Sequence, residues 1–198
     1  VVDTAVSAGV EHLVYSSSCG AKEPDRGVSY WDAKRAVAEY LTGSDGMDWT
    51  IVRPVSFMEN YVGDTAALDR GVITGMLTPD KTLQVISGHD IGRWVVAAFE
   101  RRDEFAGQAI DIAAETITMD GIAAALGGVI GHEIVYRPLA PAVSASAEES
   151  AIAMTRWYQQ YGYDENIEAL DARWGVPMCG FEEWLRTVWR RRSVERPV

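Results

Sequence analysis

Short apolar runs alternate with amphipathic segments along the first half of the chain. Residues 1–9 carry apolar side chains at helical spacing and end in a glycine, which suits a helix C-terminus. The run at 12–16 is short, apolar and bounded by turn residues, as a strand buried in a parallel sheet is. A helix over 29–42 and a strand over 49–53, which Pro54 ends, follow. The order helix, strand, helix, strand predicts parallel strands joined by helical crossovers.

The alternation continues through the second half of the chain, which then becomes helical. The expected strands cover residues 83–86, 108–113 and 133–137, and the expected helices cover 87–101, 118–130, 145–161, 167–174 and 181–191. Ser87 and Asp90 form a capping pattern at the start of one helix. The glycines Gly127, Gly128 and Gly131 end the next helix. We therefore expect one α/β domain whose parallel sheet is covered on both faces.

The composition is that of a folded protein with a negative surface. Of 198 residues, 47% are hydrophobic and 24% are charged, which is enough apolar material for a sizeable core. No apolar run approaches the roughly 18 residues of a membrane span, and no secretion signal is recognisable, so we expect a cytoplasmic protein. The net charge of −11 repels nucleic acid and anionic lipid. The expected partner is a small-molecule substrate, bound by a monomer or homodimer that contacts neither nucleic acid nor membrane.

Cysteine and histidine are too sparse to form a metal centre. Cys19 and Cys179 make neither a disulfide framework nor a metal-binding pair, which indicates a reducing compartment. The histidines His12, His89 and His132 lack ligand spacing, so we expect no metal. Cys19 follows three serines directly, and two interpretations stay open for it, a reactive thiol and an inert one.

Tyr30 and Lys34 form the sharpest chemical pattern in the chain. A separation of four residues puts both side chains on one helical face, where the ammonium is expected to lower the pKa of the phenol. An ionisable tyrosine can act as a general acid or base. Exposed helical tyrosines and lysines are also ordinary surface residues. The pair alone therefore leaves both interpretations open.

Ser16, Ser17 and Ser18 end the first predicted strand. This is the edge of an open α/β sheet where ligands bind, and a hydroxyl there can hydrogen-bond a substrate carbonyl. The alternative is a turn whose serines satisfy their own backbone. The strand, the short spacing to Tyr30 and the helix that carries Lys34 together favour an active site.

Serines followed by Tyr30-x-x-x-Lys34 resemble the active site of short-chain dehydrogenase/reductases. Four further segments resemble the NmrA-like, atypical branch of that superfamily: AGVEHLVYSS at 8–17, VRPVSFMEN at 52–60, HDIGR at 89–93 and FEEW at 181–184. The likeness covers almost the whole chain, and the RPxxFMEN segment is its most specific part. It implies an α/β fold: the C-terminal portion of a Rossmann-like sheet, with a smaller, mostly helical substrate lobe. The Rossmann portion would cover 1–60 and 82–115, and the lobe 61–81 and 116–198.

The resemblance implies a role for each catalytic position. Ser18, or its neighbour Ser17, is expected to polarise the substrate, and Tyr30 to act as acid or base. Lys34 is expected to assist Tyr30 and to hold the nicotinamide ribose, so that Ser17, Tyr30 and Lys34 also contact the cofactor.

The resemblance further implies the walls of the site. Pro54, Val55 and Phe57 are expected beside the nicotinamide, and the wall of the substrate pocket is expected to begin with Met58, Asn60 and Tyr61. Without the resemblance, Pro54 to Phe57 are interpreted as a strand end with a core aromatic.

The resemblance implies an NAD(P)H-dependent oxidoreductase that transfers hydride to or from a small carbonyl, quinone or enone. NADP is the expected cofactor, with NAD possible. Many NmrA-like proteins lack the tyrosine and are thought to bind the dinucleotide without reducing anything, so the presence of Tyr30 favours an enzyme. A non-catalytic NAD(P)-sensing regulator and a truncated inactive remnant are the alternatives.

One family feature is missing from the sequence. The family opens with a strand and a G-x-x-G-x-x-G turn that places the pyrophosphate on a helix N-terminus, and this chain has no such turn. We expect either a fragment of a longer protein or a chain that has lost most of its cofactor site. The sequence leaves both open.

Aromatic residues gather in the C-terminal part of the chain. Trp157, Tyr158, Tyr161 and Tyr163 are expected to group near Trp174. Such a group packs in a core or lines the mouth of a substrate pocket.

Overall fold

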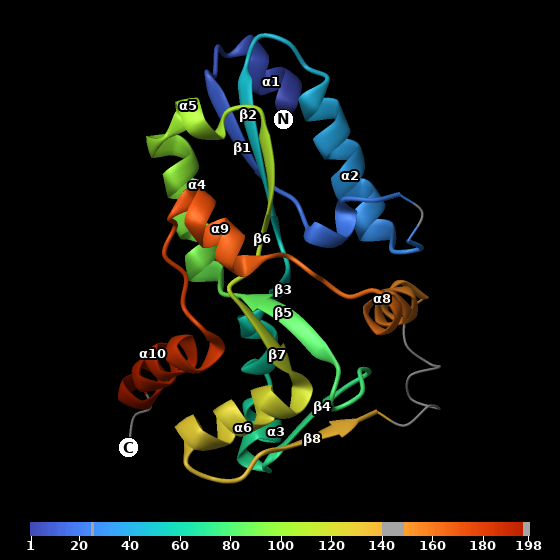
Figure 1. Cartoon of the computed structure of the whole chain (residues 1–198), viewed down its shortest axis with the longest axis vertical. Coiled ribbons are helices and arrows are strands. Elements are labelled where there is room, and N and C mark those ends of the chain that lie inside the picture. Colours follow the sequence, from blue (N-terminus) through green and yellow to red (C-terminus); the bar gives the residue numbers. More distant parts are fainter. Residues whose placement is uncertain (25, 140–148, 196–198) are drawn as a thin grey trace.

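The computed structural model describes residues 1–24, 26–139 and 149–195 (Figure 1). Its first sheet is parallel, in the order β1-β2-β6, with β1 at His12–Ser16, β2 at Asp48–Pro54 and β6 at Gln108–Ile112. Helices α1 (Val2–Ser7) and α2 (Ser29–Thr42) lie on one side of this sheet, and α4 (Gly88–Glu100), α5 (Arg102–Phe105) and α9 (Ile167–Trp174) lie on the other. The expected parallel sheet with helices on both faces is thus present.

The two faces of β2 explain this layering. Ile51 packs with Val2 of α1 and Leu41 of α2, all buried. The next residue, Val52, points to the opposite face and packs in the cluster that holds Trp94 of α4. Because successive side chains of a strand alternate between faces, a run of apolar residues at 51–52 needs helices on both sides.

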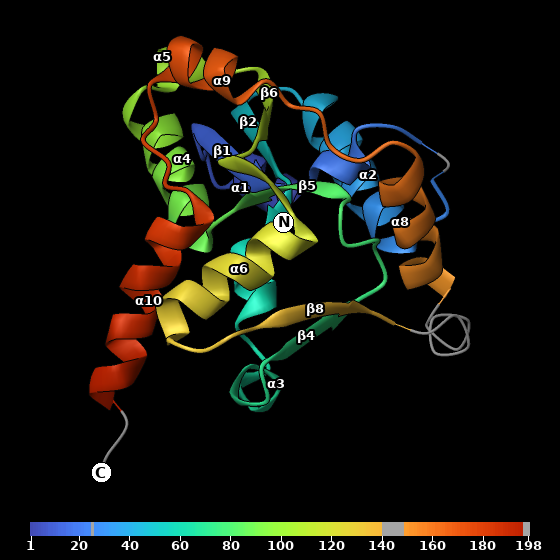
Figure 2. The ribbon, with the colours of Figure 1, turned by 60° about the horizontal axis from the view of Figure 1, so that its bottom comes forward.

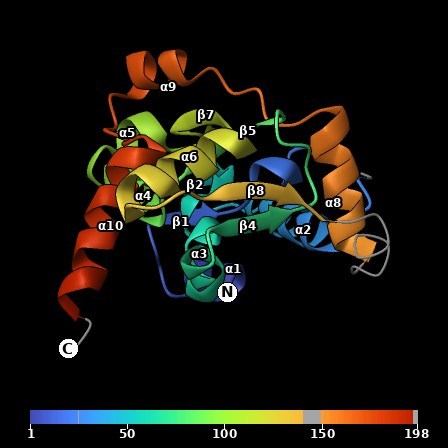
Figure 3. The ribbon, with the colours of Figure 1, turned by 90° about the horizontal axis from the view of Figure 1, so that it is seen from below.

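A second group of elements forms the lower part of Figure 1. Strand β3 (Ser56–Phe57) runs parallel to β5 (Thr82–Ile86), and β7 (Glu115–Thr118) pairs antiparallel with β5. The parallel pair β4 (Val72–Gly75) and β8 (Val135–Pro138) lies side by side in Figure 3. Helices α3 (Thr65–Asp69), α6 (Met119–Ile130) and α10 (Phe181–Glu195) complete this group, whose core includes Leu126, Phe181 and Leu185.

Three further helices frame the region between the two groups. They are the 3-10 turns η1 (Cys19–Ala21) and η2 (Met58–Tyr61) and the helix α8 (Glu149–Gln160). Figure 2 shows α8 beside α2, where Met154 and Trp157 pack against the buried Trp31. No helix among the described residues is long and apolar enough to cross a membrane.

Helix ends follow the predicted capping chemistry. The Ser87 hydroxyl accepts a hydrogen bond from the backbone N–H of Asp90 at 3.0 Å, which starts α4. Gly131 ends α6 in the left-handed conformation at φ 94°, which confirms the glycine cluster as a helix end. The helix expected at 145–161 is α8 from Glu149, and residues 145–148 lie outside the described residues.

The expected lobe contains short strands beside its helices. Strands β4, β7 and β8 lie in its ranges, and β3, β4 and β7 were not expected. Each of these three has four residues or fewer, which is too short for a period-two pattern to show in the sequence.

Candidate functional site

A cavity of about 560 Å³ lies between the two groups of elements. Its wall comes from the end of β1, the first turns of α2, the segment from Pro54 to Tyr61, strand β4 and helix α8. Of the site residues expected from the sequence, the following nine line it: Ser17, Ser18, Tyr30, Lys34, Pro54, Val55, Phe57, Asn60 and Tyr61. The size suits a small-molecule ligand.

Ser17 brings an unsatisfied hydroxyl to this cavity. Strand β1 ends at Ser16. The Ser17 backbone N–H donates the last hydrogen bond to β2, to the Val52 carbonyl at 2.8 Å, and this bond holds Ser17 at the edge of the sheet. The Ser17 side chain is 4% exposed, and its Oγ has no hydrogen-bond partner among the described residues. A buried hydroxyl without a partner costs free energy that a ligand oxygen can recover. Ser18 is partly buried on the same wall.

Tyr30 enters the cavity from the first turn of α2. Its hydroxyl donates to the Met154 sulfur of α8 at 3.5 Å, a weak acceptor that leaves the proton available to a better one. Burial raises the pKa of Tyr30 above its ordinary value. The expected lowering of this pKa by Lys34 is therefore wrong, and the phenol is protonated at neutral pH.

Lys34 lies one turn after Tyr30 but points to the strand end. Its ammonium donates to the Ser16 carbonyl at 3.0 Å and lies 5.7 Å from the centre of the Tyr15 ring. These contacts hold the positive charge at the end of β1, beside the serines. The position suits a hydrogen bond to a ligand hydroxyl at the sheet edge.

The end of β2 and the segment after it form the neighbouring wall, because β2 pairs with β1. Pro54 and Val55 are buried, whereas Phe57 is 41% exposed. Asn60 is exposed, and burial raises the pKa of Tyr61 to about 12. This wall therefore offers flat apolar surface and neutral polar groups.

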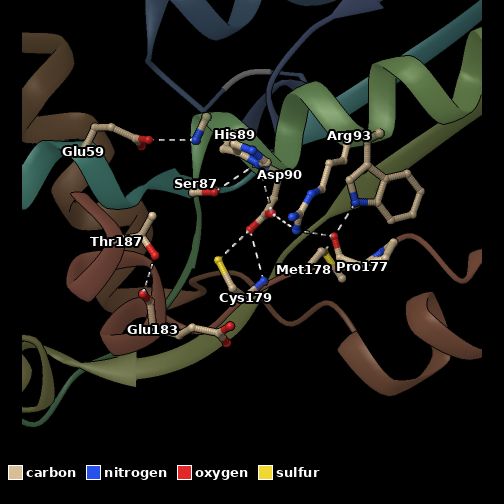
Figure 4. Close-up of polar contacts among 12 residues, drawn as sticks. Glu59, Ser87, His89, Asp90, Arg93, Pro177, Met178, Cys179, Glu183 and Thr187 are labelled. Carbon is tan, nitrogen blue, oxygen red and sulfur yellow. Dashed lines mark hydrogen bonds and ion pairs between the residues drawn. The ribbon is translucent and has the colours of Figure 1, made fainter. Parts of the chain in front are cut away.

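Met58 and Glu59 do not contribute to this wall. Met58 is 0% exposed in the core cluster that also holds Leu68, and it does not line the cavity, so its expected place in the pocket wall is corrected. Glu59 accepts a hydrogen bond from the Gly88 N–H at 2.9 Å and caps the N-terminus of α4 (Figure 4). A carboxylate is stabilised there by the helix dipole. The most specific segment of the resemblance is thus partly structural.

The HDIGR segment is structural as well. Asp90 is fully buried, accepts from Arg93 at 3.0 Å and from the Cys179 backbone N–H at 3.2 Å, and ties α4 to the segment before α10 (Figure 4). Neither Asp90 nor Arg93 lines the cavity.

The expected C-terminal aromatic group forms in part: the ring centres of Trp157, Tyr158 and Tyr163 lie 5.1–5.2 Å apart, but Trp174 packs elsewhere. Trp174 packs on Phe105, with ring centres 4.4 Å apart, whereas Trp157 packs on Trp31 at 5.1 Å. Tyr158 and Tyr163 line the cavity and join their hydroxyls at 2.9 Å. Of the two interpretations, the pocket lining holds for these two tyrosines and packing holds for the tryptophans.

A second, smaller cavity of about 430 Å³ adjoins Cys19. Side-chain ligand atoms of Cys19, Asp111 and Glu165 lie within 4.8 Å of one another. Asp111 is already paired with Arg53 at 2.6 Å and with Lys22 at 2.9 Å, so cations compensate its charge. Burial raises the pKa of the Cys19 thiol, which favours the inert interpretation of this cysteine. We interpret the cluster as an ion-pair network.

Comparison with known proteins gives one family match. The model of the NmrA-like family matches residues 1–185. A curated relative is the (4-alkanoyl-5-oxo-2,5-dihydrofuran-3-yl)methyl phosphate reductase of Streptomyces griseus, 27% identical over 140 residues, which are 70% of this chain and 49% of the relative. The chain therefore spans about half the length of this curated relative.

Solved structures agree on the fold. An NADPH-dependent quinone oxidoreductase from Escherichia coli superposes with a TM-score of 0.76 at 20% identity, covering 96% of this chain and 71% of that one. NmrA, a negative transcriptional regulator in complex with NADP, gives 0.72 at 18% identity, covering 100% and 70%. The triphenylmethane reductase of Citrobacter sp., complexed with NADP(H), gives 0.72 at 15% identity, covering 94% and 68%. At these identities the likeness shows the fold, which is the Rossmann type expected from the sequence.

Proposed function

The chain belongs to the NmrA-like family, and from this membership we propose that it carries the nicotinamide and substrate end of an NAD(P)H-dependent oxidoreductase. The observation that carries the proposal is the convergence of Ser17, Tyr30 and Lys34 on one cavity at the carboxyl end of β1. The unpartnered Ser17 hydroxyl supports the proposal, because a ligand oxygen at this edge would give it a partner.

Each residue has a part that its position supports. Tyr30 gives a proton to the substrate oxygen during reduction, since its phenol is protonated and its present acceptor is a weak one. Ser18 or Ser17 hydrogen-bonds the same oxygen and polarises the carbonyl. Lys34, held at the Ser16 carbonyl, donates to a ribose hydroxyl. The cofactor supplies the hydride when bound.

The cofactor is proposed as NADP, with NAD as the second choice. Related folds were solved with NADPH, NADP or NAD. The residues named above bear on the nicotinamide half, where Pro54, Val55 and Phe57 would form an apolar wall for the ring. Asn60 and Tyr61 extend that wall to the substrate.

A regulator that binds the dinucleotide without turnover is the second candidate. It is favoured by the likeness to NmrA, whose structures are described as those of a negative transcriptional regulator. The presence of Tyr30 in the cavity favours the enzyme, since a sensor has no need of a proton donor there.

The two candidates separate in a paired assay of binding and turnover. NADPH oxidation is followed at 340 nm with menadione, 2-cyclohexenone and benzaldehyde, and NADPH binding is followed by fluorescence. We expect Tyr30→Phe to lower turnover about a hundredfold or more, the range for loss of a general acid, with binding retained. Tyr40→Phe is the matched control, because this tyrosine lies on α2 and does not line the cavity. NADPH binding without oxidation of any acceptor contradicts the enzyme and supports the regulator.

A further inference from the structure

The cavity carries very little charge. Among its described lining residues, Lys34 is the one charged side chain, and its ammonium already contacts the Ser16 carbonyl. The sequence of residues 140–148 contains no lysine or arginine either. An anionic group placed against the wall away from Lys34 would therefore lose its water without gaining a counter-ion there.

The wall opposite the strand end is apolar and adaptable. Met76 and Leu77 follow β4, Leu83 lies on β5, and Met119 and Met154 come from α6 and α8. Methionine fills irregular space around flat ligands because its side chain is unbranched and polarisable. This lining suits a ring or a short hydrocarbon body.

Neutral hydroxyls interrupt the apolar wall at one place. Ser56, Tyr61, Tyr158 and Tyr163, here called the hydroxyl cluster, all line the cavity. The Tyr158 hydroxyl donates to that of Tyr163 at 2.9 Å, and the Ser56 hydroxyl interacts with the phenols of Tyr61 and Tyr158. These contacts gather four neutral hydroxyls, each of which can donate and accept hydrogen bonds, at one place on the wall.

The cluster remains uncharged across the physiological range. Burial raises the pKa of Tyr61 to about 12 and raises the pKa values of Tyr158 and Tyr163 as well. Neutral phenols donate hydrogen bonds to a carbonyl or hydroxyl oxygen without offering a positive charge to an anion. The cluster thus discriminates by charge as well as by shape.

We propose that the substrate of this cavity is an uncharged, largely apolar ring compound, one oxygen of which is bound by the hydroxyl cluster, and that phosphate esters of the same ring are excluded. This inference rests on the proposed function for the identity of the reacting end, where Tyr30 lies. It adds the hydroxyl cluster as a recognition site, and it predicts that uncharged carbonyl compounds enter the cavity whereas anionic ones do not.

The test compares two probes that share a ring and differ in charge. Binding of 1-naphthol and of 1-naphthyl phosphate to the whole protein is measured by titration calorimetry. We expect the phosphate to bind at least tenfold more weakly than the naphthol. Equal or tighter binding of the phosphate overturns the proposal, and so does a lack of binding by 1-naphthol. Because no hydride is transferred, these outcomes are independent of whether NADPH oxidation is found.

Two variants locate the effect. Tyr163→Phe removes one hydroxyl of the cluster and is expected to weaken 1-naphthol binding about fivefold, the equivalent of one hydrogen bond. Tyr161→Phe is the matched control, since Tyr161 is 55% exposed and does not line this cavity. Met76→Lys adds a cation to the wall and is expected to raise the affinity for 1-naphthyl phosphate. Equal effects of the two phenylalanine variants contradict the assigned place of the ring oxygen. If Met76→Lys does not raise the affinity for 1-naphthyl phosphate, the exclusion of phosphate esters by the uncharged wall is contradicted.

Discussion

Replacing Asp90 with asparagine tests how the C-terminal segment is held on α4. One carboxylate oxygen of Asp90 accepts from Arg93 at 3.0 Å, and the other accepts from the backbone N–H of Cys179 at 3.2 Å and from its thiol at 3.4 Å (Figure 4). Asparagine keeps the shape but has a single acceptor oxygen, so its amide must turn a donor toward one of these donors.

The size of the loss follows from the burial of this group. Asp90 is fully buried, and a hydrogen bond to a charged group contributes about 1.5–3 kcal/mol, so we expect Asp90→Asn to cost about 2–3 kcal/mol of unfolding free energy. For a chain of this size that lowers the Tm by about 5–10 °C. The Arg93 side chain is 44% exposed and glutamine can still donate one hydrogen bond to the buried Asp90, so Arg93→Gln is expected to cost less than Asp90→Asn, about 1–2 kcal/mol.

The assay is urea unfolding followed by tryptophan fluorescence, with both variants measured beside the unchanged protein. The contrast between them is the decisive quantity. If Asp90→Asn and Arg93→Gln lose the same small amount, the bonds to Cys179 do not anchor the segment, and the reasoning is refuted.

Three further predictions concern the region around η1. Gly20→Ala places a Cβ 2.2 Å from the buried Trp31 ring, and we expect a loss of about 1–3 kcal/mol in urea unfolding, whereas an unchanged midpoint would contradict this packing. Cys19 is buried and its thiol pKa is raised, so we expect it to react with a thiol reagent only after denaturation, and rapid modification of the native protein at Cys19, located by mass spectrometry, would disprove this. Burial raises the pKa of Glu165 in the folded protein above its value in the unfolded chain. The folded protein is therefore stabilised while Glu165 is protonated, and this stabilisation is lost as the pH rises through the folded-state pKa. The Tm of Glu165→Gln relative to the unchanged protein should therefore increase from about pH 4 to about pH 7, and a difference that is constant over this range counts against it.

The sequence pattern predicted that Ser17 and Tyr30 lie close together, and both line the cavity for a simple reason. Ser17 and Tyr30 are placed by local structure, the end of one strand and the first turn of the next helix, and the carboxyl edge of a parallel sheet brings such groups together. The direction of the Lys34 side chain could not be read from its spacing to Tyr30, because its contact with the Ser16 carbonyl depends on how α2 packs against β1.

The other wall depends on contacts between residues far apart in the chain. Met154 and Tyr158 reach the cavity on a helix more than 120 residues after Tyr30, and no local pattern encodes that approach. Met58 and Glu59 show the reverse case, in which residues within a specific motif turn out to serve the core and a helix N-terminus. A motif marks positions under constraint without saying whether the constraint is chemical or structural.

The most direct test of the proposed chemistry is a single-turnover measurement of hydride transfer from NADPH deuterated at C4, with menadione as acceptor, in the unchanged protein and in Tyr30→Phe. We expect a primary isotope effect in the unchanged protein, and in Tyr30→Phe a rate about a hundredfold lower with NADPH still bound. An equal rate in both proteins would contradict the role of Tyr30 as the proton donor. Bound NADPH that transfers no deuterium to any acceptor tried would contradict the enzyme itself.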